Sequence, residues 1–168
     1  FQNNQNLLSV HDHDAQISVG ARVVVTDDGH AIKVGPGLLG RAIDALGHPL
    51  DDGPALQLSD SWPLNGKKTN PLARRPVDQQ LDVGVRVINS LLTVGQGQRI
   101  GIIAGSGVGK SVLMGMIAKN SSADINVIGL IGERGREVQE FVSDTLGPDG
   151  LKKSVVIAST SDTSAMSR

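Results

Sequence analysis

The pattern of hydrophobic and polar residues along the 168-residue chain changes from a strand-like pattern in its first part to alternating strand and helix patterns in its second. In the first part, Ala21–Thr26 and His30–Val34 are rich in residues that favour strands, and Asp27-Asp28-Gly29 separates them. Two such runs joined by an Asp-Gly turn predict a β-hairpin. We interpret this hairpin as belonging to a small β-module.

A domain junction is predicted at Gly35-Pro36-Gly37, because glycine and proline interrupt regular structure. Residues 1–36 are accordingly assigned to the β-module, and residues 37–168 are assigned to a second domain. Repeated prolines and glycines between Asp60 and Pro76 predict that this segment is an extended linker.

From Leu81 onward, apolar residues either recur with a helical period or form short continuous runs. The predicted helices are Leu81–Leu92, Gly109–Asn120 and Arg136–Leu146, the last of them ended by Gly147-Pro148, and the predicted strands are Arg99–Ala104, Asp124–Ile131 and Ser154–Thr160. Strands that alternate with helices predict an α/β fold with a parallel sheet and right-handed crossovers. Because Asp124–Ile131 is apolar almost throughout, we expect both faces of this strand to be covered.

Composition narrows the classes of function. The chain has 16 basic and 17 acidic residues and a net charge of -1, which does not favour binding to nucleic acid or to a membrane surface. The absence of cysteine excludes a disulfide framework and thiolate metal sites, and it is compatible with a cytosolic enzyme. His11-Asp12-His13-Asp14 is interpreted as a solvated loop, since no further metal ligand is in view.

The chain from Ala104 to Ser111 has the pattern of a loop that binds phosphate groups. It joins a predicted strand to a predicted helix, which is the context that such a loop requires, although Ala104 replaces the usual first glycine. Glycines allow backbone angles closed to other residues, and they let amide groups approach a phosphate at the positive end of a helix. The residues expected to bind the nucleotide are Gly105, Ser106, Gly107, Val108, Gly109, Lys110, Ser111 and Val112.

Two residues at the end of this loop have specific expected roles towards ATP. Lys110 would reach the β- and γ-phosphates, and the Ser111 hydroxyl would hold Mg²⁺. The alternative is an ordinary turn between a strand and a helix that happens to contain glycines. The strand before the loop and the helix after it favour a nucleotide site.

A second charged motif, Gly132–Glu137, follows the next predicted strand. Ligands of open parallel sheets bind outside the carboxyl ends of the strands, so Glu133 is expected on the side that holds the γ-phosphate. A carboxylate there can orient or polarise the attacking water, and the cations of Lys110 and Arg134 would favour its ionised form. Alone, the motif would be interpreted as a loop with salt-bridging charges, and its pairing with the phosphate loop favours a function.

Taken together, Ala104–Ser111 and Gly129–Val138 resemble the ATPases of type III protein export, which are relatives of the β-subunit of rotary ATP synthases. Gly37–Asp51, Asn70–Pro76 and Leu81–Arg86 are also similar to segments of that family. The resemblance implies a P-loop NTPase fold of the RecA/F1 type, preceded by the end of a small β-barrel. The sequence Gly-Ser-Gly-Val-Gly-Lys-Ser in the loop is most similar to the flagellar branch, and the injectisome branch is the alternative.

By this resemblance, Lys110 is the phosphate-binding lysine, Ser111 is the Mg²⁺ ligand, Glu133 is the catalytic glutamate, and Arg134 lies beside the γ-phosphate. The resemblance implies ATP and Mg²⁺ as cofactors and a homo-hexamer with nucleotide at the subunit interfaces. Its implied partners are export apparatus proteins, export substrates and chaperones, and its implied location is cytoplasmic, peripheral to the export apparatus at the inner membrane.

Two expected parts of such an enzyme are not found in the sequence, which begins at Phe1 and is interpreted as a piece of a longer protein. The resemblance places a Mg²⁺-associated aspartate and an arginine finger beyond Arg168, and Asp162 is a poor substitute for the aspartate. Residues 1–168 alone are therefore expected to be inactive.

Three other classes of protein fit the sequence less well than a catalytic export ATPase does. Non-catalytic ring subunits typically carry glutamine where Glu133 stands. ATP synthase β-type subunits usually show Gly-Lys-Thr in place of Gly109-Lys110-Ser111. A small-molecule kinase is the least favoured, because no acceptor-binding lid is visible.

Overall fold

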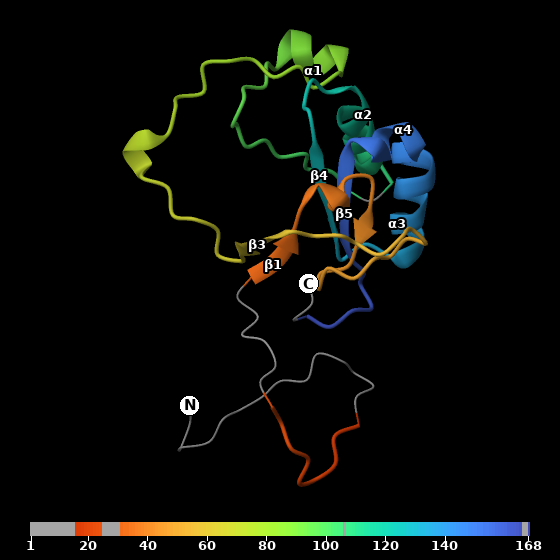
Figure 1. Ribbon diagram of the computed structural model, residues 1–168. Coiled ribbons are helices and arrows are strands. Elements are labelled where there is room, and N and C mark those ends of the chain that lie inside the picture. The colour runs from red at the N-terminus through yellow and green to blue at the C-terminus, as the bar shows by residue number, and fades with distance from the viewer. Residues whose placement is uncertain (1–15, 25–30, 106, 166–167) are drawn as a thin grey trace.

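Two sheets organise the part of the chain that the computed structural model describes, which comprises residues 16–24, 31–105, 107–165 and 168 (Figure 1). The larger sheet is parallel and has the strand order β2-β5-β4, with β2 at Ala42–Ile43, β4 at Asn126–Ile131 and β5 at Ser154–Ser159. The smaller sheet pairs β1 (Ala31–Val34) with β3 (Asp60–Pro63) in antiparallel orientation. The predicted α/β class with a parallel sheet is confirmed.

The helices that follow the phosphate loop gather on one side of β4 and β5 (Figure 1). The helical elements are η1 (Pro36–Leu38), η2 (Pro71–Ala73), α1 (Arg86–Leu91), α2 (Lys110–Asn120), α3 (Gly135–Glu140), the π-helix η3 (Phe141–Leu146) and α4 (Gly147–Lys152). The helices predicted at Gly109–Asn120 and Arg136–Leu146 are therefore present, the second as α3 and η3. Gly147, with φ 65°, and Pro148 end η3 as expected, but they also begin α4, which the sequence did not predict.

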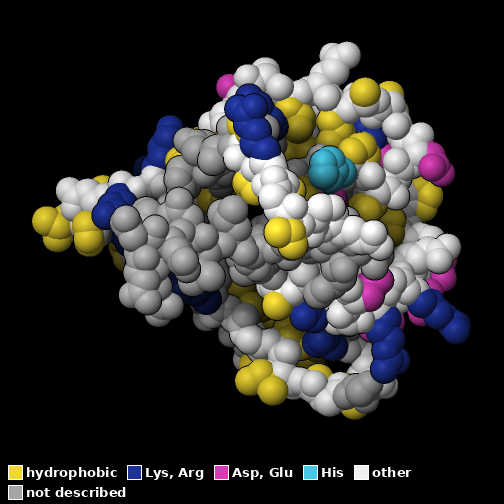
Figure 2. Space-filling view, turned by 90° about the horizontal axis from the view of Figure 1, so that it is seen from below, with side chains coloured by type: hydrophobic (Ala, Val, Ile, Leu, Met, Phe, Trp, Pro, Cys, Tyr) yellow, Lys and Arg dark blue, Asp and Glu magenta, His cyan; other side chains and the backbone are white. Residues whose placement is uncertain are grey.

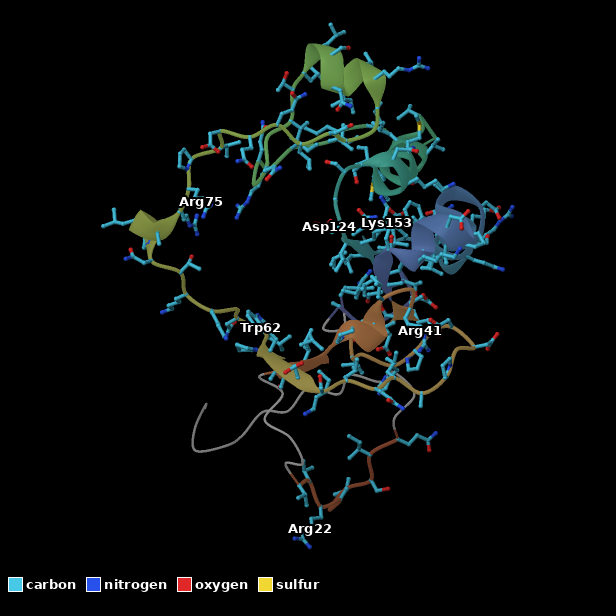
Figure 3. The ribbon with its side chains drawn as sticks, turned by 45° about the horizontal axis from the view of Figure 1, so that its top comes forward. Arg22, Arg41, Trp62, Arg75, Asp124 and Lys153 are labelled. Atoms are coloured by element: carbon cyan, nitrogen blue, oxygen red, sulfur yellow. The ribbon has the colours of Figure 1, made fainter. Side chains whose placement is uncertain are left out.

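The register of the parallel sheet brings the ends of β4 and β5 together. Asn126 pairs with Ser154 and Ile131 with Ser159, so neither strand extends beyond the other. Where the two strands begin, the Asn126 amide donates to the Lys153 carbonyl at 2.9 Å, and Figure 3 labels Lys153 at this end of the sheet. At the carboxyl ends of the two strands, the Gly132 amide donates to the Ser159 carbonyl at 2.7 Å. The loops that follow β4 and β5 therefore emerge from the same edge of the sheet.

The core lies between the sheet and the helices on that one side. Its buried residues are Ala42, Ala118, Ile128, Leu130, Phe141, Leu146, Val156 and Ala158. Alternate residues of β4 point away from this core, and Val127 remains 71% exposed and Ile131 51% exposed. The expectation that β4 is covered on both faces is wrong for the described residues, because β4 is an edge strand with helices on one face only.

Pairing over long distances also changes three of the elements predicted from local patterns. Residues 21–24 form no strand, the turn at residues 27–29 lies outside the described residues, and β1 pairs with β3 inside the segment predicted as linker. Residues 99–104 are not a strand, since neither edge of the sheet pairs with them among the described residues.

The predicted helix at Leu81–Leu92 begins only at Arg86. Before it, the Leu81 amide donates to the Val94 carbonyl at 2.7 Å, and Gly84 has φ 70°. Both features prevent this stretch from continuing the helix. Val83 and Val85 are nonetheless buried, and they pack with Val94 in a second small cluster.

A charged pair holds the short strand β2 in place. Arg41 Nη2 lies 2.6 Å from Asp51 Oδ1, and the Ala42 amide donates to Asp51 Oδ2 at 2.8 Å. These hydrogen bonds, the Arg41 guanidinium foremost, lower the pKa of Asp51 to about 2. The Arg41 carbonyl in turn accepts from the Val156 amide at 3.0 Å, so the pair fixes the junction between β2 and β5. Figure 3 shows Arg41 beside this junction.

Candidate functional site

The phosphate loop enters α2 through two glycines in left-handed conformations. Gly107 has φ 76° and Gly109 has φ 95°, and Gly109 is the residue that caps α2. A side chain would strain the backbone at both positions. Gly105 does not have a positive φ, so only two of the three glycines are required by their backbone angles. Ser106 lies outside the described residues.

Lys110 and Glu133 face each other across the site. Lys110 is the first residue of α2, and Glu133 follows the end of β4, yet Lys110 Nζ lies 3.6 Å from Glu133 Oε1. Their side chains are 43% and 34% exposed, so each can reach solvent and a ligand. The acidic side chain is therefore turned toward the glycine loop, on the side that the topology of a parallel sheet predicts.

The backbone around Glu133 is held by the loop that follows β5. The Ser161 amide donates to the Glu133 carbonyl at 2.9 Å, one residue after the contact between Gly132 and Ser159. Gly132 has φ 78°, which favours glycine and turns the chain sharply out of β4. Glu133 is thus positioned by long-range contacts as well as by its own strand.

A cavity of about 340 Å³ lies over the phosphate loop. Its lining residues are Gly105, Gly107, Gly109, Lys110, Ser111, Val112, Glu133 and Glu137. A second cavity of about 410 Å³ shares Lys110, Ser111 and Glu133 with the first, and it continues between α2, β4 and α3 towards Phe141. Backbone amides, an ammonium group, a hydroxyl and two carboxylates therefore converge on one open space.

Arg134 is the one predicted catalytic residue whose side chain lies away from these cavities. It is 82% exposed, and its Nη1 lies 3.8 Å from Glu137 Oε1. The Arg134 amide also donates to Glu137 Oε2 at 3.4 Å. Asp162, considered as a substitute metal ligand, lines neither cavity, and a hydrogen bond from Thr160 lowers its pKa.

Glu137 is the residue at this site that the sequence reasoning missed. It lines both cavities and accepts from the backbone at the start of α3. In the structure Glu137 lies three residues after Arg134, the residue that caps α3, and the two residues form a capping box. The predicted helix began at Arg136, so the sequence reasoning did not contain this spacing. Capping does not indicate that the same carboxylate faces the phosphate loop.

The residues present fit a nucleotide with Mg²⁺. The glycine amides and Lys110 match phosphate oxygens, and the Ser111 hydroxyl is an oxygen ligand of the kind that Mg²⁺ takes. No group of three or more His, Cys, Asp or Glu side chains that could hold a metal occurs among the described residues.

Fold and site together define a P-loop nucleotide-binding domain, and the comparisons with known proteins specify the family. Residues 84–168 match the nucleotide-binding domain of the ATP synthase alpha/beta family. The chain is 52% identical over 170 aligned residues to a flagellum-specific ATP synthase of Bacillus subtilis (strain 168), a match that covers 100% of this chain and 38% of that protein. The chain belongs to the ATP synthase alpha/beta family.

Solved structures of type III secretion ATPases are similar to this chain in fold and in sequence. An ATPase described as prototypical of the type III secretion system of pathogenic bacteria has a TM-score of 0.78 and 51% identity, covering 83% of this chain and 40% of its own. The assembled ATPase EscN of enteropathogenic E. coli, in complex with its central stalk EscO, has a TM-score of 0.75 and 50% identity, covering 82% and 34%. The chain thus spans well under half the length of these relatives.

Proposed function

We propose that this chain is the nucleotide-binding part of an ATPase that hydrolyses ATP to drive type III protein export, specifically the export of flagellar components. The observation that carries the proposal is the 3.6 Å approach of Lys110 Nζ to Glu133 Oε1 over the phosphate loop. It brings a phosphate-binding cation and a candidate general base to one cavity. The similarity to flagellum-specific and type III secretion ATPases supports the export role.

The phosphate loop and the start of α2 would bind the phosphates of ATP. Amides in the turns at Gly107 and Gly109 can approach the phosphate oxygens closely, and the eleven-residue helix α2 adds positive potential at its first turn. The Lys110 ammonium adds a full charge that can reach the β- and γ-phosphates. Binding therefore rests on groups that the fold already holds at one end of one helix.

Glu133 would activate the water molecule that attacks the γ-phosphate. The γ-phosphate would compete with Glu133 for Lys110, because both are anions within reach of the same ammonium group. Once Lys110 turns to the phosphate, the Glu133 carboxylate is free to accept a hydrogen bond from water and to orient it for attack. Arg134 would serve as an additional cation for the γ-phosphate once its guanidinium group exchanges Glu137 for the phosphate.

Ser111 is the residue that would hold Mg²⁺, and the ion supplies positive charge that offsets the charge of the transferred phosphoryl group. We further propose that residues 1–36 end a β-barrel domain and that residues 37–168 begin the nucleotide-binding domain. β1 lies before this proposed boundary and β3 lies after it, and the two strands pair in one small sheet that crosses the boundary.

Assembly and location follow the relatives. We propose a cytoplasmic homo-hexamer, peripheral to the export apparatus at the inner membrane, that acts on export substrates and their chaperones. EscN, which is assembled and in complex with a stalk protein, supports an oligomeric ring. No helix in the described residues is long and apolar enough to cross a membrane.

The test is Glu133→Gln in a full-length protein that carries this sequence. The amide keeps the size of the side chain but cannot act as a base, so kcat should fall by about 10²–10⁴ while the Kd for ATP changes by less than about threefold. Steady-state hydrolysis and binding of a fluorescent ATP analogue measure the two quantities. A parallel loss of binding and turnover would show that Glu133 has a structural role.

Asp149→Asn is the control. Asp149 Oδ1 lies 2.8 Å from Lys152 Nζ, its side chain is 95% exposed, and it lines neither of the two cavities at the phosphate loop. An exposed ion pair contributes little to stability, so this variant should keep the hydrolysis rate of the unmodified protein.

A further inference from the structure

The phosphate-loop helix α2 and the π-helix η3 come into tight contact at one glycine. Gly115 is buried in the middle of α2, and a Cβ atom placed on it would collide with Thr145 Cγ2. The same Cβ would lie 3.3 Å from the Thr145 carbonyl oxygen. Cγ2 is attached directly to Cβ of a β-branched side chain that has few rotamers in a helix, so it cannot easily move aside. The contact with the carbonyl oxygen is less severe, because a shift of a few tenths of an ångström relieves it. This contact therefore sets a lower limit on the separation of the two helices.

Local preference does not explain a glycine at this position. Within a helix, glycine is less stable than alanine because it loses more conformational freedom on folding. The φ of Gly115 is not in the left-handed region, so no backbone angle requires glycine there. Close packing against Thr145 is the feature of the structure that accounts for it.

Both partners are connected directly to the site. Gly115 lies five residues after Lys110 in the same helix, which corresponds to about 7.5 Å along the axis. Thr145 belongs to the helical stretch that begins just after Arg134, and it lines the larger cavity together with Lys110 and Glu133. A change in the spacing of α2 and η3 would therefore change the spacing of Lys110 and Glu133.

The form of η3 is consistent with this role. Six residues from Phe141 to Leu146 adopt a π-helix, whose i→i+5 hydrogen bonds are rare and often occur at functional sites. Phe141 and Leu146 are buried at its two ends, which anchor it in the core. Thr145 is thus presented to α2 from a segment that has little freedom to withdraw.

We propose that Gly115 and Thr145 are positioning residues, whose close contact sets the distance between the phosphate loop and the catalytic carboxylate. This inference rests on the proposed function, since it concerns the rate of hydrolysis at that site. The contact is proposed to affect the chemical step and not nucleotide binding. The loop amides and Lys110 lie at the start of α2, so they move together with that helix and keep their arrangement around the phosphates.

The experiment compares Gly115→Ala with the double variant Gly115→Ala/Thr145→Ser in the full-length protein. Gly115→Ala should lower kcat by about ten- to a hundredfold, since a displacement of roughly 1 Å can cost about 10² in rate. The Kd for a fluorescent ATP analogue should change by less than about threefold on the same reasoning. Thr145→Ser removes Cγ2 while keeping the hydroxyl, so the double variant should recover most of the lost kcat.

Met116→Ala is the control, because Met116 is the next residue of α2 and its side chain is exposed. It should hydrolyse ATP at the unmodified rate. A Gly115→Ala protein with unmodified kcat, or a double variant with no recovery, overturns the proposal. If Gly115→Ala alone does not fold, a folded and active double variant supports the proposal, and a double variant that is equally unfolded overturns it.

The same measurements separate this inference from the proposed function. An unmodified protein that does not hydrolyse ATP, or whose hydrolysis survives Glu133→Gln, contradicts the proposed function itself. An unmodified protein that is active and depends on Glu133, but is insensitive to Gly115→Ala, contradicts only the positioning role.

Discussion

At the scale of single residues, the candidate site contains opposite charges that partly neutralise one another. Lys110 is paired with Glu133, and Arg134 is paired with Glu137. These side chains are at least one-third exposed, so each pair contributes little to stability and is easily exchanged for a ligand. The phosphates of a nucleotide would replace the two carboxylates as partners of the two cations.

The first residue-scale prediction concerns Lys110. Lys110→Ala in the full-length protein should abolish measurable ATP turnover, because it removes an ammonium group that lies at the phosphate loop within reach of Glu133. Initial rates of phosphate release provide the measurement. Lys119→Ala, at the far end of α2, is the control and should keep its activity. Unchanged hydrolysis in Lys110→Ala would refute the assignment of the phosphate loop.

At the scale of elements, the position of the site depends on which strands pair. The parallel register of β4 and β5 aligns their carboxyl ends, and the loop after β5 then fastens Glu133 through the Ser161 amide. On the other side of β5, the short strand β2 is held through the pair of Arg41 and Asp51. A two-residue strand has too few ladder hydrogen bonds to hold itself, so the charged pair contributes to its placement.

The element-scale prediction is a pH-dependent loss of stability in Asp51→Asn. The folded pKa of Asp51, about 2, lies below its value of 3.8 in an unfolded chain, so the carboxylate stabilises the fold above that value. This contribution is lost as the pH falls through the range from 3.8 to about 2. Asp51→Asn should therefore lower the free energy of unfolding by about 1–2 kcal/mol at pH 7, and by progressively less below pH 4.

Urea denaturation followed by circular dichroism at several pH values measures this difference in the full-length protein. Asp52→Asn is the matched control, because Asp52 is the neighbouring residue and is exposed. A destabilisation by Asp51→Asn that stays constant from pH 7 to pH 3 would show that the charge of Asp51 is not its source.

At the scale of the whole molecule, the parallel sheet of the described residues is open at one edge and on one face. β4 is an edge strand with one exposed face, and residues 99–104 have no strand partner. Lys and Arg side chains form separate groups among other residues on the face shown in Figure 2, which agrees with the net charge of -1. The chain also covers only 38% of the Bacillus subtilis relative.

The prediction at this scale is that residues 1–168 alone do not hydrolyse ATP. By resemblance, an arginine from a neighbouring subunit lies outside this stretch, and such a residue contributes about 10³–10⁵ in rate. The turnover of residues 1–168 should therefore be at least about 10³ lower than that of the full-length protein under equal conditions. Turnover from residues 1–168 that is less than about 10³ below the full-length rate would contradict this prediction.

Local patterns predicted the helix α2 and the strands β4 and β5. They succeeded because helix and strand periods are visible in short windows. The left-handed backbone at Gly107 and Gly109 also agrees with a turn that glycine was expected to allow. They failed for residues 99–104 and for β3, since strand formation requires a partner that a local window does not contain.

The sequence by itself determined the chemistry available at the site: glycines with open backbone angles, one lysine, one serine and a glutamate at the end of the following strand. Only the tertiary structure decided that Glu133 faces Lys110, that Glu137 joins them, and that Gly115 meets Thr145. The physical reason is that the first set of properties belongs to residues and short segments. The second set depends on contacts between residues that are far apart in the chain, which form only when β4, β5 and the helices pack together.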